Sequence, residues 1–142
     1  MSFYNTILVA IDLNEDAEKV IQKAHKISLQ NNATLTIIHV AEPLSYAYGG
    51  DIPMDLSDVQ NQLHENAKLQ MHELIQQHNL GEATQLLVSG HIQTEVHKVA
   101  NELSTDLVIV GSHGRHGLAL LLGSTSSSIL HGATCDVLAV RV

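Results

Sequence analysis

The chain has 142 residues, 44% of them hydrophobic, so it is long enough to bury one core and too apolar to be disordered. Its 7 basic and 15 acidic residues give a net charge of −8, which argues against a protein that binds the backbone of a nucleic acid. The single cysteine excludes an intrachain disulfide and a cysteine zinc site.

The first predicted element is a strand at residues 7–11, an apolar, β-branched run of the kind that is buried on both faces of a sheet. This run is too short for a signal peptide or a membrane span, so we expect a cytoplasmic protein without membrane insertion. Asn14 is a favourable N-cap, and apolar residues at helical spacing predict a helix over residues 15–30. Residues 31–32 end that helix, and residues 33–40 form the second predicted strand.

A long irregular connection at residues 41–54 separates these elements from the rest of the chain, and connections of this length are uncommon unless they are functional. Asp55 is predicted to cap a helix that ends at about residue 77. The remaining predicted elements are a strand at 85–88, a helix at 92–103, a strand at 107–110, a helix at 124–131 closed by Gly132, and a strand at 136–142.

Alternating strands and helices predict an α/β fold in which helices cover both faces of a parallel sheet. Because crossovers between parallel strands are right-handed, the simplest arrangement is a doubly wound, open sheet of five strands in the order 3-2-1-4-5. Residues 1–142 then form one domain. In such a sheet a ligand binds beyond the carboxyl ends of the strands.

Two loops compete for a ligand at this edge. The loop after the first strand, residues 12–16, has three acidic residues and no glycine, so the dinucleotide-binding fingerprint is absent. Within it, Asp12 is either a carboxylate that contacts a ligand or a structural one that accepts backbone N–H groups of the next helix.

The loop after the fourth strand, residues 111–117, contains three glycines that let the backbone approach a ligand closely. Gly123, Ser124 and Thr125 then open a helix, whose free N–H groups and hydroxyls suit an anion. Arg115 is the only positive charge available to this loop. The loop is not a P-loop, because no lysine follows, and the alternative interpretation is a structural turn with a helix cap.

Over essentially its whole length, the chain resembles the universal stress protein family. Residues 45–50 and 55–60 look most like the UspA branch of that family, which is known for not binding ATP. The segments that carry the overall resemblance are residues 7–12, 37–40, 106–114 and 135–140.

The resemblance implies a nucleotide site as well as a fold. ATP-binding members of the family have the pattern Gly, two residues, Gly, nine residues, then Gly-Ser or Gly-Thr. Gly111, Gly114 and Gly123 with Ser124 match this pattern, although eight residues instead of nine separate Gly114 from Gly123. The implied ligand is ATP or a related adenine nucleotide, and Mg²⁺ could accompany its phosphates.

Ten residues correspond to the nucleotide site of the family. They are Ala10, Asp12 and Val40 on the adenine and ribose side, Gly111, His113, Gly114 and Arg115 in the loop beside the ribose and phosphates, and Gly123, Ser124 and Thr125 around the phosphates.

The residues do not indicate catalysis or metal binding. His113 and His116 are three apart, but no Cys, His or Glu cluster at ligand spacing accompanies them, so we expect no metal site. Cys135, near His131, lacks an orienting third group and is expected to be a buried, unreactive thiol. Without a general base or a carboxylate pair for Mg²⁺ beside the phosphate loop, any ATP hydrolysis would be slow.

Three functions remain open. The first is a cytoplasmic stress-response protein that binds an adenine nucleotide and acts as a regulatory or protective homodimer. The alternative is an interaction module that binds a protein partner, without nucleotide, through residues 41–54 and a dimer surface. The third is an ATP-dependent enzyme of the related pyrophosphatase type, whose glycine-rich loop belongs after the first strand, where this chain has Asp12 and Glu15.

The last predicted strand, residues 136–142, lies at a sheet edge in the expected topology. It is apolar, and no proline interrupts it, so it invites pairing with another chain. Members of the family commonly pair through this strand. We therefore expect a two-fold homodimer in which the two copies of this strand run antiparallel.

Overall fold

The computed structural model describes residues 2–42, 55–112 and 124–142, so all but the first two residues of the predicted connection 41–54 lie outside it. Every strand and helix predicted from the sequence is present, with ends within two residues of the predicted ones. In chain order the elements are β1 (Thr6–Ala10), α1 (Ala17–Asn31), β2 (Thr34–Ala41), α3 (Asp55–Gln77), β3 (Thr84–Ser89), α4 (Ile92–Glu102), β4 (Leu107–Gly111), α5 (Ser124–Leu130) and β5 (Asp136–Val140).

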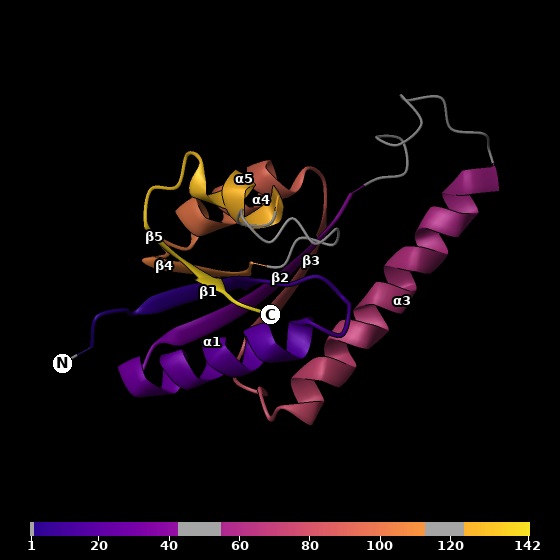
Figure 1. Ribbon diagram of the computed structural model, residues 1–142. Helices are drawn as coiled ribbons and strands as arrows, with labels where there is room; N and C mark the ends of the chain where they lie inside the picture. Colours follow the sequence, from indigo (N-terminus) through magenta and orange to yellow (C-terminus); the bar gives the residue numbers. More distant parts are fainter. Residues whose placement is uncertain (1, 43–54, 113–123) are drawn as a thin grey trace.

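The five strands form one parallel sheet in the order β3-β2-β1-β4-β5, which confirms the predicted doubly wound arrangement (Figure 1). The central strand is β1, in which Ala10 pairs with Ile38 of β2 and Ile7 pairs with Leu107 of β4. Because the strands are parallel, the carboxyl ends of β1, β2 and β4 lie at the same edge of the sheet. We call this edge the carboxyl edge and the opposite one the amino edge.

Helices cover both faces of the sheet, with α1 and α3 on one face and α4 and α5 on the other (Figure 1). Successive residues of β1 alternate between two cores, since Ile7 and Val9 pack toward α1 and α3 whereas Leu8 and Ala10 pack toward α4 and α5. Burying a side chain of this size contributes about 1.5–3 kcal/mol. The continuous apolar run of β1 therefore supports both helical layers at once.

The beginning of α1 differs from the prediction. The helix starts at Ala17 instead of residue 15, and its N-cap is Asp16, which makes no side-chain capping bond. Asn14 acts one turn earlier, where its Oδ1 accepts a hydrogen bond from the Asp16 N–H at 2.9 Å. Asn and Asp side chains often form such turns in competition with a helix cap. The predicted end of the helix is confirmed, because Asn32 adopts a left-handed conformation with φ 52°.

At the amino edge, one carboxylate ties two strands together. Asp106, immediately before β4, accepts hydrogen bonds from the backbone N–H groups of Asn5 at 2.8 Å and Thr6 at 3.1 Å. The Asp106 N–H in turn donates to the carbonyl of Thr6 at 3.0 Å. Asp106 thereby aligns the starts of β1 and β4.

The first residues of the chain are fixed at the same edge. Asn31 Oδ1, at the end of α1, accepts hydrogen bonds from the N–H groups of Phe3 at 2.9 Å and Tyr4 at 3.3 Å. The Tyr4 hydroxyl donates to Asp136 Oδ2, at the start of β5, at 2.9 Å. This bond to the carboxylate, followed by desolvation and the negative charge of Asp136, raises the pKa of Tyr4 above its ordinary value.

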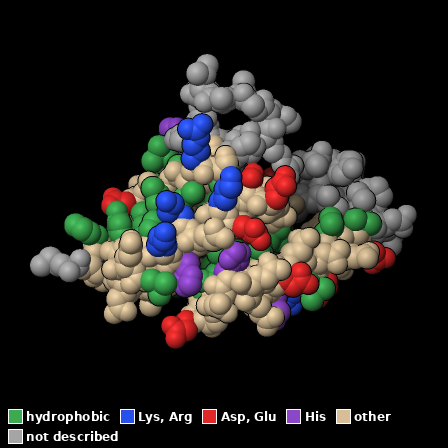
Figure 2. Space-filling model, turned by 60° about the horizontal axis from the view of Figure 1, so that its bottom comes forward, with side chains coloured by type: hydrophobic (Ala, Val, Ile, Leu, Met, Phe, Trp, Pro, Cys, Tyr) green, Lys and Arg blue, Asp and Glu red, His purple; other side chains and the backbone are tan. Residues whose placement is uncertain are grey.

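The helix α3 extends beyond the sheet that it covers (Figure 1). Its inner residues Ala67, Met71 and Ile75 are buried, whereas Val59 and Leu63 near its start are 45% and 53% exposed. Figure 2 shows the face covered by α1 and α3, where basic side chains gather on one part and acidic ones on others. In the described part of the chain no helix, including the 23-residue α3, is long and apolar enough to cross a membrane.

Candidate functional site

The carboxyl edge brings together four of the predicted site residues from three neighbouring strands. Ala10 is the last residue of β1, Asp12 follows two positions later, Val40 lies near the end of β2, and Gly111 ends β4. The side chains of Ala10 and Val40 are each 6% exposed and belong to the same core, under α4 and α5. These two apolar side chains thus line the α4/α5 face of the sheet just before its edge.

In the described part of the chain, the Asp12 carboxylate does not accept backbone N–H groups of α1, the structural alternative that the sequence left open. Its side chain is exposed, and within the described part of the chain its carboxylate has no hydrogen-bond partner. The N–H of Ala17, at the start of α1, is bonded instead to the carbonyl of Asn14 at 3.1 Å. The Asp12 carboxylate is therefore available to accept hydrogen bonds from a ligand.

Of the other predicted residues, Ser124 and Thr125 form the first two positions of α5, on the same face of the sheet as Ala10 and Val40. The remaining four lie outside the described residues: His113, Gly114, Arg115 and Gly123. The structure therefore describes six of the ten predicted residues, and nucleotide binding by both sides of the site stays a prediction.

Gly111 has a packing role that the sequence did not reveal. A Cβ atom at this position would lie 3.2 Å from Val20 Cγ2 on α1, closer than side chains normally approach. The next residue, Ser112, donates its N–H to the carbonyl of Val140 in β5 at 2.8 Å. A glycine at position 111 thus lets α1 approach β4. A side chain at this position would point toward α1, and not toward the α4/α5 face.

Two further residues at the carboxyl edge were missed by the sequence analysis. His39, in β2, donates a hydrogen bond from Nδ1 to the carbonyl oxygen of Ile11 at 2.8 Å. Gly90, between β3 and α4, has φ +152° and donates its N–H to the carbonyl of Ala41 at 3.1 Å. A side chain at Gly90 would also meet Glu95. The signal for His39 was a lone polar residue inside the otherwise apolar run of residues 37–40.

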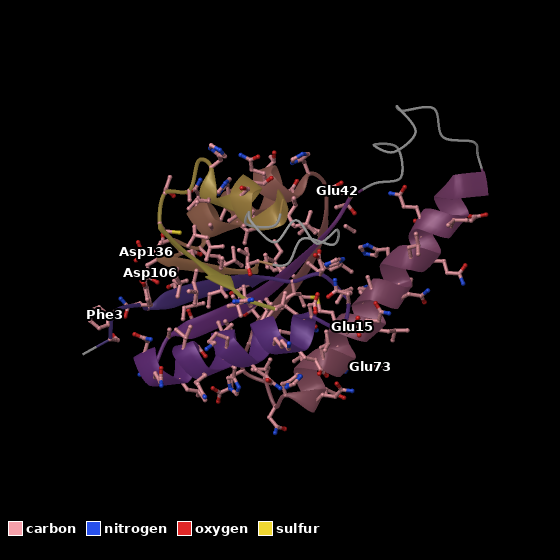
Figure 3. All side chains as sticks on the ribbon, viewed as in Figure 1. Phe3, Glu15, Glu42, Glu73, Asp106 and Asp136 are labelled. Atoms are coloured by element: carbon pink, nitrogen blue, oxygen red, sulfur yellow. The ribbon has the colours of Figure 1, made fainter. Side chains whose placement is uncertain are left out.

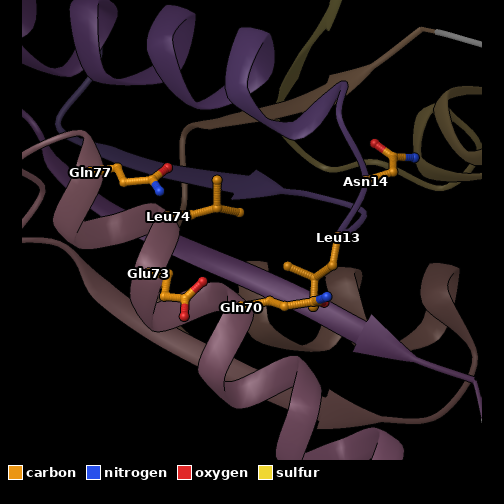
Figure 4. Close-up of a pocket in the computed structure, with 6 residues that line it drawn as sticks. All are labelled: Leu13, Asn14, Gln70, Glu73, Leu74 and Gln77. Carbon is orange, nitrogen blue, oxygen red and sulfur yellow. The ribbon is translucent and has the colours of Figure 1, made fainter.

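A separate cavity lies on the opposite face of the sheet from Ala10 and Val40 (Figure 4). Its volume is about 180 Å³, and three of its polar groups are amides of asparagine or glutamine, with one carboxylate. Such a lining can hydrogen-bond a small polar molecule, and the carboxylate of Glu73 is its ionisable group. The lining residues come from the loop after β1 and from α3: Leu13, Asn14, Gln70, Glu73, Leu74 and Gln77.

Metal-binding and nucleophilic side chains do not converge in the described part of the chain. There, no group of three or more His, Cys, Asp or Glu residues could hold a metal ion. The half-buried Cys135 packs against the core under α4 and α5. Desolvation, and then the charges of Asp136 and Asp106, raise the pKa of this thiol, which favours its unreactive protonated form.

Comparison with known proteins identifies the family of the chain. A model described as "Universal stress protein family" matches residues 3–141. The chain belongs to the universal stress protein family. Universal stress protein A homolog 2 of Coxiella burnetii is 42% identical over 100% of this chain and 98% of its own length, and homolog 1 of the same bacterium is 40% identical over 96% of each.

Solved structures of universal stress proteins share the fold. UspA from Lactobacillus plantarum superimposes with a TM-score of 0.81 at 20% identity, covering 99% of this chain and 100% of that one. The hypothetical protein MJ0577 gives a TM-score of 0.80 at 25% identity, covering 98% and 96%. A universal stress protein crystallised in complex with cAMP gives a TM-score of 0.69 at 21% identity, covering 96% of each chain.

Proposed function

We propose that this universal stress protein binds ATP or a related adenine nucleotide at the carboxyl edge, and acts as a cytoplasmic, regulatory or protective homodimer of one-domain chains. The observation that carries the proposal is the convergence of Ala10, Asp12 and Val40 at one edge of the sheet, next to the end of β4. The glycine pattern that resembles the phosphate loop of the family begins at that end, with Gly111.

The chemistry of these residues suits a nucleoside. The Asp12 carboxylate, which has no partner among the described residues, can accept hydrogen bonds from ribose hydroxyls, as acidic residues do in other nucleotide-binding α/β folds. Val40 and Ala10, each 6% exposed, place the apolar core of the α4/α5 face directly before this edge, where a base would meet no charged side chain from either position. The universal stress protein that was crystallised with cAMP supports an adenine nucleotide as the ligand class.

The proposed role is binding and not rapid turnover. In the described part of the chain, no group of three or more carboxylates, histidines or cysteines is placed to hold a metal ion. Phosphoryl transfer depends on positioned metal ions and on a residue that orients the attacking water. The proposal therefore gives the bound nucleotide a regulatory role, with Mg²⁺ as a companion of its phosphates.

Equilibrium binding of labelled ATP to nucleotide-free protein tests this function. Gly114→Val and Gly123→Val should each abolish binding while the protein stays folded, because a branched side chain blocks the approach of the phosphates. His116→Ala is the control and should change the affinity little. Competition with ADP, GTP and cAMP would define the base and the phosphates that are recognised. A folded wild-type protein that binds none of them would favour the interaction module without nucleotide.

The dimer is proposed to form through β5. Among the described residues this strand pairs with β4 alone and forms one side of the sheet, and Val137, Leu138 and Ala139 along it are half-buried. Pairing with a second copy would satisfy its open backbone groups. Ala139→Pro removes a backbone donor in the middle of the proposed contact and should give a monomer by light scattering. A monomeric wild type at tens of micromolar, or a folded Ala139→Pro dimer, would contradict this interface.

A further inference from the structure

We propose that His39 is a positioning residue that fixes the segment carrying Asp12, and thereby prepares the carboxyl edge for its nucleotide. The inference rests on the proposed function and extends it to a residue that does not touch the ligand. Two consecutive residues of β2, Ile38 and His39, form hydrogen bonds with Ile11, which lies between the end of β1 and Asp12. The Ile11 N–H donates to the carbonyl of Ile38 at 3.0 Å, and the Ile11 carbonyl accepts from His39 Nδ1 at 2.8 Å.

The geometry of the peptide bond carries the effect of His39 to Asp12. The carbonyl of Ile11 and the N–H of Asp12 belong to one peptide unit, which is planar. A hydrogen bond that fixes the direction of this carbonyl therefore fixes the orientation of the whole peptide plane, which includes the Cα atom of Asp12. The strand β1 ends at Ala10. The His39 side chain therefore adds a bond between β2 and the residue that follows the end of β1.

The position of His39 argues against direct contact with a nucleotide. Side chains alternate along β2, where Leu35 and Ile37 belong to the core under α1 and α3 and Val40 belongs to the core under α4 and α5. By this alternation His39 points to the α1/α3 face, away from Val40 and from α5. Its effect on a ligand must therefore pass through the backbone of Ile11 and Asp12.

The chemistry of the bond also specifies which substitution can replace the histidine. A carbonyl only accepts hydrogen bonds, so Nδ1 of His39 carries the hydrogen. The amide nitrogen of an asparagine stands at nearly the same distance from the backbone as Nδ1 of a histidine, and it always carries hydrogen. His39→Asn therefore retains the donor, whereas His39→Leu retains bulk and removes the donor.

The test compares ATP affinity in these variants. Losing one hydrogen bond that orders a contact residue should raise the Kd of His39→Leu about fivefold to tenfold, and His39→Asn should stay within about twofold of the wild type. The matched control is His97→Leu, since His97 makes the same kind of bond from Nε2 to the carbonyl of His131 at 2.9 Å, beyond the last turn of α5. His97→Leu should leave the Kd within about twofold of the wild type.

Hydrogen exchange in the ligand-free protein separates this inference from the proposed function. The amide of Ile11 should exchange about tenfold faster in His39→Leu and return to the wild-type rate in His39→Asn, while the amide of Val9 is unchanged. If the wild type binds no nucleotide, the proposed function is wrong and the exchange rates alone decide whether His39 orders this segment. Unchanged exchange of Ile11 in His39→Leu, or nucleotide affinity equal to that of a binding wild type, would overturn the positioning role.

Discussion

The two edges of the sheet use their aspartate carboxylates in opposite ways. At the amino edge, Asp106 accepts two backbone N–H groups, and Asp136 accepts the hydroxyl of Tyr4. At the carboxyl edge, Asp12 is exposed, and in the described part of the chain its carboxylate has no partner. Figure 3 shows Asp106 and Asp136 together with Phe3 at one end of the sheet, with Glu42 and Glu15 toward the other.

This contrast distinguishes carboxylates that stabilise the fold from one that is available for a ligand. Asp106 and Asp12 are the same residue type, each next to the end of a strand in the middle of the sheet. The carboxylate that is bonded to backbone groups aligns two strands, and its loss should lower stability. The Asp12 carboxylate contributes little to the free energy of unfolding, and its loss should change the nucleotide affinity alone.

The largest expected effect is on stability, from Asp106→Ala. The substitution leaves the N–H groups of Asn5 and Thr6 without an acceptor, and bonds to a charged acceptor are the stronger ones, so the free energy of unfolding should fall by about 3 kcal/mol. Urea unfolding at neutral pH measures the change. Asp106→Asn keeps one acceptor oxygen and should lose about half as much. A loss below about 0.5 kcal/mol would show that this edge is not held by the carboxylate.

The converse effect is expected from Asp12→Ala at the carboxyl edge. If ribose hydroxyls bond to this carboxylate, the Kd for ATP should rise about tenfold or more, because hydrogen bonds to a charged group contribute about 1.5–3 kcal/mol. The free energy of unfolding should stay within about 0.5 kcal/mol of the wild type, as for other exposed positions without partners. Titration with labelled ATP and urea unfolding of the same preparation would show whether binding and stability separate as proposed.

A smaller effect at the carboxyl edge should come from Gly111→Ala. The new Cβ would lie 3.2 Å from Val20 Cγ2, so α1 or β4 has to shift. Overpacking of this kind typically costs 1–3 kcal/mol, and because the contact is a single atom pair we expect about 1 kcal/mol. In a double-mutant cycle, Val20→Ala should reduce the cost of Gly111→Ala. Additive losses in urea unfolding would mean that Gly111 is required for another reason, such as the approach of a ligand.

The contrast between the two edges was only partly accessible from the sequence. The buried strands followed from continuous apolar runs such as residues 7–11, and the parallel order followed from the alternation with helices. Asp12 was assigned to the site through the resemblance to the family, and its position after such a run supported the assignment. The roles of Asp106 and His39 were not accessible, since each bonds to backbone groups distant in the sequence. Which backbone group a side chain reaches depends on strand register, such as the pairing of Ala10 with Ile38, and no local pattern specifies that register.

The smallest expected effect, and the only one with a defined pH dependence, concerns Tyr4 at the amino edge. Its hydroxyl donates to Asp136 Oδ2 at 2.9 Å, so Tyr4→Phe should lower the free energy of unfolding by less than about 1 kcal/mol at neutral pH. Because the pKa of Tyr4 is raised in the folded state, its contribution is complete below about pH 10, the value in the unfolded chain, and declines as the pH rises through the folded-state value. Urea unfolding of wild type and Tyr4→Phe between pH 7 and pH 11 should therefore show a difference that is constant up to about pH 10 and then shrinks. Ionisation of the other tyrosines occurs in both proteins and cancels in the comparison. A difference that persists unchanged at pH 11 would show that the phenol does not donate to Asp136, and the side-chain bonds of Asp106 and Asn31 would then stabilise the amino edge without it.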